Sequence, residues 1–152
     1  MNIFVKLFFF LILNLAIITK ILTANELDNV GACAGVVIGN ASVDFSLGDQ
    51  TGFDDGIKLG ITAYVSQVFA NNYSKNDIAI ADKILASNTD KIINAANTQT
   101  FDETIFEEVI KCYRMLSILV MKNADTIKIN SKKINNIINQ RNKLLRRMLS
   151  AG

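Results

Sequence analysis

The chain of 152 residues contains no histidine, no proline and no tryptophan, and it has only two cysteines. The missing histidine excludes Ser-His-Asp and Cys-His catalytic arrangements and every histidine-ligated metal site. No phosphate-binding G-x-x-x-x-G-K-[ST] or dinucleotide-binding G-x-G-x-x-G element occurs either. We therefore expect a protein that is not an enzyme and that holds no cofactor and no metal. An enzyme that works with carboxylates alone stays open as an alternative.

The absence of proline lets apolar patterns with a period of 3.6 residues run on without interruption. These patterns predict an all-α protein, a compact bundle of four to five helices with one disulfide. The expected helices cover about 27–43, 54–72, 76–96 and 126–149. A further helix precedes the last one and is expected to begin with Thr100 and Glu103, a capping-box pair.

Acidic residues gather where the helix expected at 54–72 begins. Asp54 and Asp55 would suit the positive end of the helix dipole there. Together with Asp49 they could instead bind calcium, but the spacing of an EF-hand loop is absent. Glu107 and Glu108 are a solvated pair rather than an acid–base pair, because adjacent helical residues point about 100° apart.

The longest apolar run lies in residues 1–24, which we interpret as a signal peptide. Lys6 gives a basic start, and the apolar run of about thirteen residues at 7–19 is short of the ~20 that a membrane-spanning helix needs. Cleavage is expected near Ala24. The mature protein would then be exported, to the periplasm if the source is bacterial and otherwise by secretion.

Two other readings of this region stay open. An uncleaved anchor could extend to Leu22, although Lys20 would sit poorly in hydrocarbon. A lipoprotein would carry its lipid on Cys33, although the charges of Glu26 and Asp28 are unusual between an apolar run and such a cysteine.

The two cysteines, Cys33 and Cys112, both lie in the exported part and are 79 positions apart. An oxidising compartment favours a disulfide between them, worth roughly 4 kcal/mol in the chain-entropy description. The alternative is two reduced, buried thiols. Redox catalysis would require a C-x-x-C pair or a neighbour that stabilises the thiolate, and the sequence has neither.

Three glycines, Gly31, Gly35 and Gly39, recur every four residues in the first helix of the expected bundle. This spacing permits close helix packing, although each glycine costs a helix roughly 1 kcal/mol relative to alanine. Cys33 lies on the opposite flank of the expected core stripe from the glycines. We therefore expect the disulfide to join this glycine-weakened helix to the middle of the fourth. The core stripe is Leu27, Val30, Ala34, Val37, Ile38 and Ala41.

Charge divides the chain into an acidic helical bundle at 25–125, with a net charge of −7, and a basic amphipathic C-terminal helix at 126–152, with +7. The apolar stripe of this helix is Ile127, Ile134, Ile138, Leu145 and Leu149, flanked by Ile137, Leu144 and Met148. The candidate partner or membrane surface on its other face is Lys128, Lys132, Lys133, Lys143, Arg146 and Arg147. We expect the apolar stripe to pack onto the bundle.

These features indicate a small exported helical protein with a structural or protein-interaction role. The basic helix would then be solvated or dock an acidic protein partner. The alternative is a peripheral protein that binds an anionic membrane surface through the same helix. Nucleic acid is not an expected partner of an exported chain.

Overall fold

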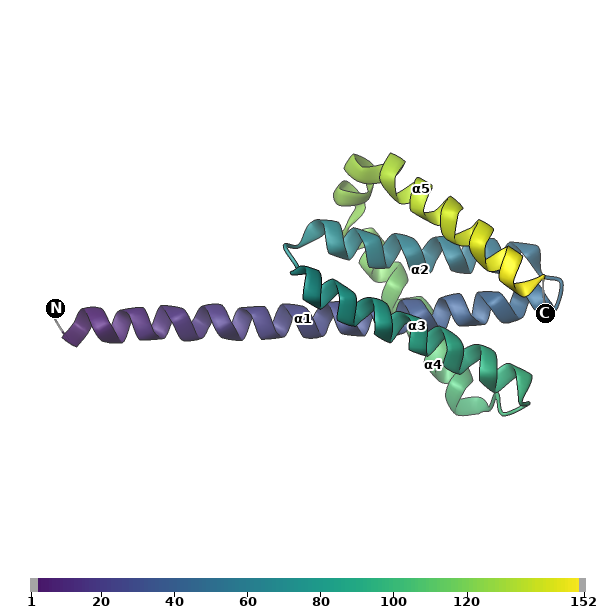
Figure 1. The fold of residues 1–152 in the computed structure, drawn as a ribbon, viewed down its shortest axis with the longest axis horizontal. Coiled ribbons are helices and arrows are strands. Elements are labelled where there is room, and N and C mark those ends of the chain that lie inside the picture. Colours follow the sequence, from purple (N-terminus) through teal and green to yellow (C-terminus); the bar gives the residue numbers. More distant parts are fainter. Residues whose placement is uncertain (1–2, 151–152) are drawn as a thin grey trace.

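The computed structural model describes the backbone of residues 3–150 and the side chains of residues 25–150. Within 3–150 the chain forms five α-helices and no strand, which confirms the expected all-α bundle (Figure 1). The helices are α1 (Ile3–Ser46), α2 (Gln50–Ala70), α3 (Lys75–Asn97), α4 (Glu103–Lys122) and α5 (Ala124–Leu149).

The C-terminal half of α1 is the centre of the bundle, because α2, α3 and α4 all pack against it. Its expected core stripe is buried, and Val36 and the three glycines are buried as well. The helix is longer than expected, since its backbone is helical from Ile3 onward. Side chains of the predicted signal peptide, including Ala24 at the expected cleavage point, lie outside the described residues.

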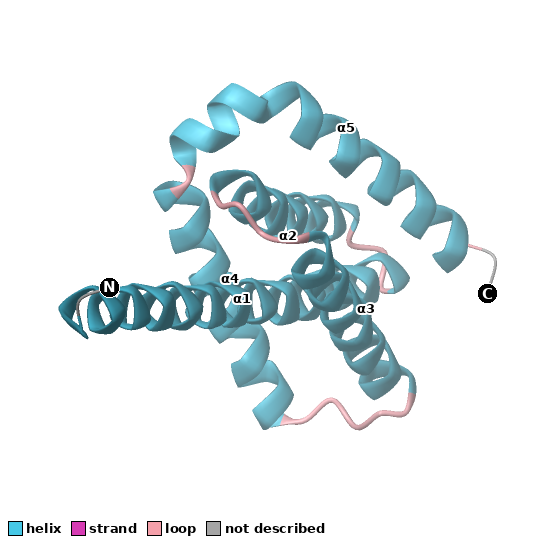
Figure 2. Ribbon diagram, turned by 60° about the vertical axis from the view of Figure 1, so that its left-hand side comes forward, coloured by secondary structure: helices cyan, strands magenta, loops and turns pink. Residues whose placement is uncertain are grey.

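A tight turn reverses the chain between α1 and α2, and α2 then lies between α1 and α5 (Figure 2). Gly48 adopts a φ of 88° in this turn, and the Asp49 side chain caps α2 by accepting a hydrogen bond from the Gly52 backbone N–H at 2.9 Å. This cap starts α2 four residues earlier than the sequence suggested. The prediction that Asp54 and Asp55 mark the helix start was therefore wrong.

The next two helices begin with side-chain caps. Ser74 and Asp77 form a capping box at the start of α3, which the sequence analysis had not identified. Asp102 caps α4 by accepting from the Ile105 backbone N–H at 3.0 Å. The predicted capping pair of Thr100 and Glu103 was wrong, because the Thr100 backbone N–H donates to the Ala95 carbonyl and closes the end of α3.

The core has two parts. The larger part surrounds the middle of α1 and contains side chains from α2, α3 and α4. The smaller part lies near the α1–α2 turn and is built around Ile38, Phe53 and Ile57, with side chains of α5 packed against it. The position of α5 therefore depends on the second part of the core.

Candidate functional site

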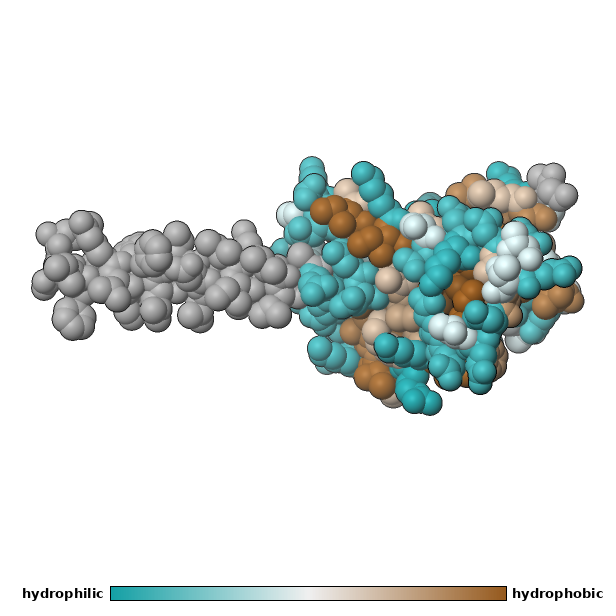
Figure 3. Space-filling view, turned by 90° about the horizontal axis from the view of Figure 1, so that it is seen from below, coloured by the Kyte–Doolittle hydropathy of each residue, from teal (hydrophilic) through white to brown (hydrophobic). Residues whose placement is uncertain are grey.

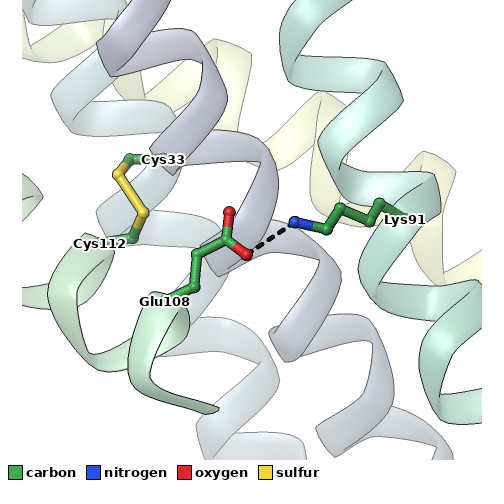
Figure 4. The surroundings of a disulfide bond; sticks show 4 residues. All are labelled: Cys33, Lys91, Glu108 and Cys112. Atoms are coloured by element: carbon green, nitrogen blue, oxygen red, sulfur yellow. Dashed lines mark hydrogen bonds and ion pairs between the residues drawn. A yellow bond between two sulfur atoms is a disulfide. The ribbon is translucent and has the colours of Figure 1, made fainter. Parts of the chain in front are cut away.

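The two cysteines form the expected disulfide. Cys33 of α1 and Cys112 of α4 have Cα atoms 4.9 Å apart, a normal separation for a disulfide (Figure 4). Close to it, Lys91 of α3 and Glu108 of α4 form an ion pair at 2.7 Å, so Glu108 has a partner instead of being only solvated. A covalent link thus joins α4 to α1, and a solvent-exposed ion pair links it to α3.

The three glycines spaced four residues apart, Gly31, Gly35 and Gly39, lie at the contact between α1 and α3, and we call them the glycine ladder. A Cβ added at Gly31 would lie 2.9 Å from the Ala81 carbonyl oxygen, and one added at Gly39 would lie 2.9 Å from the Thr89 carbonyl oxygen. A Cβ at Gly35 would overlap the Leu85 carbonyl oxygen. The glycine ladder therefore lets the backbone of α3 pack directly against α1. The four-residue spacing of the glycines had predicted this close contact.

A second set of glycines, on α2, allows α2 to approach α1 closely. The sequence analysis did not identify this set. Gly56 and Gly60 of α2 are buried, and a Cβ at Gly56 would lie 2.7 Å from the Ala41 Cβ. A Cβ at Gly60 would lie 3.3 Å from the Ala34 carbonyl oxygen. The signal was present in the four-residue spacing of Gly52, Gly56 and Gly60.

The apolar stripe of α5 packs onto the bundle, as expected. Ile134 is only 2% exposed, and Ile138 and Leu145 are half-buried against the core around Phe53 and Ile57. Burial of this stripe stabilises a helix whose several asparagines contribute little helix propensity. The stripe is consequently not available to a membrane in this conformation.

Arg146 does not belong to the open basic surface that the sequence suggested. Its guanidinium donates to Asp54 at 2.7 Å and to Gln50, and it lies 4.7 Å from the ring centre of Phe53. The hydrogen bond from Asn142 and then the one from Arg146 lower the pKa of Asp54. Arg146 and Asp54 therefore fasten the end of α5 to the start of α2.

Lys133 also has a contact within the chain. Its ammonium nitrogen lies 5.9 Å from the ring centre of Phe69, at the far end of α2 from Asp54. The remaining cations, which we call the basic face, have exposed side chains and form no ion pair with the side chains of residues 25–150. The basic face is Lys128, Lys132, Lys143 and Arg147.

The α4–α5 junction holds a buried polar cluster that the sequence analysis did not identify. The Asn123 side-chain amide donates to Ser66 Oγ and to Gln67 Oε1, each at 3.2 Å, and Gln67 in turn donates to Tyr73 Oη at 3.0 Å. Asn123 is the residue between the two helices. Its hydrogen bonds to α2 therefore fix where α5 begins.

A groove separates α3 from α5 and is floored by α1 and α2. Its volume is about 370 Å³, and we call it the α3–α5 groove. Ile137, Leu144 and Met148, which flank the packed stripe of α5, all line it. The polar side chains on its walls are Tyr64, Asp82, Thr89, Asp90 and Arg141.

Acidic side chains elsewhere in residues 25–150 do not form a cluster that could hold a metal ion. Within the described residues, no three Asp, Glu, Cys or His side chains lie close enough together to hold a metal ion. Asp44 and Asp49 do approach each other at the α1–α2 turn, where partial burial and then the charge of Asp49 raise the pKa of Asp44. This pair lies outside the α3–α5 groove.

The outer side of α4 is unusually apolar for a surface. Phe106, Ile110, Ile118 and Met121 are each at least 44% exposed. The face drawn in Figure 3 likewise shows separate apolar patches within a mainly hydrophilic surface. In the part of the chain that the structure describes, no helix has the length and apolar character that a membrane crossing requires.

Comparison with known proteins gives no family assignment for this fold. No protein-family model, no curated protein and no solved structure matches the chain.

Proposed function

We propose that this chain is a small exported protein that binds an acidic protein partner through the basic face of α5. The proposal rests on which side of α5 packs on the bundle and which side faces solvent. Its apolar stripe is taken up by packing on α2, while Lys128, Lys132, Lys143 and Arg147 point to solvent. A rigid surface of one charge sign attracts an oppositely charged partner and speeds their encounter.

The exposed apolar side chains of α4 also favour a protein contact. Phe106, Ile110, Ile118 and Met121 are exposed apolar side chains of one helix, in two pairs separated by the exposed Arg114 and Ser117. Protein interfaces commonly combine apolar side chains with a polar rim, and exposed apolar patches often mark such contacts.

The alternative, binding to an anionic membrane surface, uses the same cations in a different way. An amphipathic helix at a membrane buries its apolar face in the boundary between headgroups and acyl chains. Here Ile134, Ile138 and Leu145 already pack on the bundle, so α5 would have to detach before it could insert. The packing therefore favours the protein partner.

Export is supported by the disulfide, because such bonds persist in the periplasm and outside the cell and are rare in the cytosol. A cysteine held in a disulfide has no free thiol for the lipid of a lipoprotein, so pairing of Cys33 also argues against that alternative. Intact-mass measurement of the protein recovered from the envelope or medium should show that residues 1–24 have been removed. A full-length or lipid-modified mass would contradict cleavage near Ala24.

The partner proposal is tested with two defined probes, labelled poly-glutamate and vesicles containing phosphatidylglycerol. Replacing all four cations of the basic face with glutamine should weaken poly-glutamate binding by roughly tenfold or more at low salt. Fluorescence anisotropy measures the polypeptide, and co-sedimentation measures the vesicles. Tighter binding to the vesicles than to the polypeptide would support the membrane alternative instead.

A matched variant removes the same charge from the body. Lys58, Lys75, Lys83 and Lys111 are all exposed and lie on α2, α3 and α4. Their replacement with glutamine should reduce poly-glutamate binding much less. Equal losses in both variants would show that binding follows net charge rather than the basic face.

A further inference from the structure

The α3–α5 groove is bounded by side chains from four helices. Ile38 of α1, Ile61 and Val65 of α2, Leu85 of α3 and Leu145 of α5 supply its apolar floor and walls. At its rim, Leu144 is 48% exposed and Met148 is 62% exposed. A volume of about 370 Å³ is within the range of small-molecule sites, which run from about 300 to 1,000 Å³.

An occupant would remove the apolar walls of the groove from water. The groove opens to solvent at Leu144 and Met148, and transfer of apolar surface out of water is favourable. Water is a poor substitute over the apolar part of the walls, because an ordered water needs several polar partners. An apolar molecule of the right size would therefore bind there favourably.

The charged groups of the groove differ in how far they are already paired. Tyr64 Oη donates to Asp82 at 2.8 Å, and burial followed by this hydrogen bond raises the pKa of Tyr64, so the phenol remains a donor. Asp82 is therefore partly compensated by the Tyr64 hydroxyl. Arg141 also lines the groove and forms no ion pair with the side chains of residues 25–150.

Asp90 has no such compensation. It lies two helical turns beyond Asp82 on α3, and it forms no ion pair with the side chains of residues 25–150. Two carboxylates and one guanidinium leave the groove with a net negative charge.

We propose that the α3–α5 groove binds a small apolar molecule that carries one cationic group. The apolar part lies between α3 and α5, against Ile61, Leu85 and Leu145, and the cation lies at Asp90. Because Asp90 is exposed at the rim, it can pair with the cation without first being moved into an apolar environment. This site is separate from the basic face, which lies on the solvent side of α5.

Three probes with the same octyl chain separate the charge from the apolar contact. Octylamine is cationic at neutral pH, octanol is neutral and octanoate is anionic. Isothermal titration calorimetry of the full mature protein should show the tightest binding for octylamine and the weakest for octanoate. Asp90→Asn should weaken octylamine binding about fivefold to tenfold and leave octanol binding unchanged.

The location is tested by filling the groove. Ala86 lines it and has an exposed side chain, so Ala86→Phe should block octylamine and octanol alike without disturbing the core. Ala79→Phe on the same helix and Glu107→Gln on α4 lie outside the groove and should leave both affinities unchanged. Replacing the four cations of the basic face with glutamine should also leave the affinity for octylamine unchanged.

Two results would overturn the proposal. Octanoate or octanol binding as tightly as octylamine would exclude a cation-selective site. Unchanged octylamine affinity in Ala86→Phe, with the helical circular dichroism of the parent protein, would place the binding elsewhere.

Discussion

Single residues decide how closely the helices of this bundle approach. Gly35 is the tightest point between α1 and α3, since a Cβ there would overlap the Leu85 backbone carbonyl. We expect Gly35→Ala to lower the free energy of unfolding by about 1–3 kcal/mol, even though alanine is the better helix former. Gly31→Ala should cost less, because its Cβ would lie 2.9 Å from the Ala81 carbonyl oxygen. Urea denaturation measures both, and equal stability of the parent and Gly35→Ala would contradict the close contact.

Asp54 gives a pH-dependent prediction at the same scale. Hydrogen bonds from Asn142 and Arg146 lower its pKa in the folded protein below the ordinary 3.8. The Asp54 carboxylate therefore stabilises the fold above the pKa of the unfolded chain, and this contribution is lost as the pH falls through the lower folded pKa. NMR titration of the side-chain carboxyl should give a value below 3.8, and Arg146→Gln should move it upward. Arg147→Gln, on the solvent side of α5, should leave it unchanged.

At the scale of elements, α5 depends on one buried row of side chains. Ile134→Ala removes a side chain that is 2% exposed and should lower the free energy of unfolding by about 2–4 kcal/mol. Ile129→Ala is the matched control, because Ile129 is 82% exposed on the same helix and should change stability by less than about 0.5 kcal/mol. Similar effects of the two substitutions would show that α5 does not pack as the structure describes.

At the scale of the whole molecule, the disulfide joins elements that are distant in the sequence. The Cys33–Cys112 bond closes a separation of 79 residues, so replacing both cysteines with serine should lower the free energy of unfolding by about 2–4 kcal/mol. Non-reducing peptide mapping should recover the two cysteine peptides as one linked species. Free thiols in the purified exported protein would contradict the bond.

The sequence could predict what depends on local pattern. Uninterrupted 3.6-residue periodicity without proline indicated four to five helices, and the buried stripe of α1 from Leu27 to Ala41 followed from the same period. The disulfide was predictable because two cysteines allow a single intramolecular pairing. The packing of Ile134 and Ile138 also followed, since an asparagine-rich helix needs burial to be stable.

The sequence alone could not show which of two neighbouring capping residues starts a helix. Thr100 and Asp102 are both good capping residues, and so are Asp49 and Asp54. Which one starts a helix depends on where the preceding helix ends and how the chain turns. Thr100 closes α3 through its backbone, which leaves Asp102 to begin α4.

What the sequence by itself determined is the helical class, the division of charge and the pairing of the cysteines, because these follow from composition and spacing along one chain. Only the tertiary structure decided which faces meet. It placed Arg146 on Asp54 and left Lys128 and Arg147 in solvent, although all are cations of the same helix. It also left the α3–α5 groove open, because α3 packs on α1 while α5 packs mainly on α2, so the two helices do not have to touch each other.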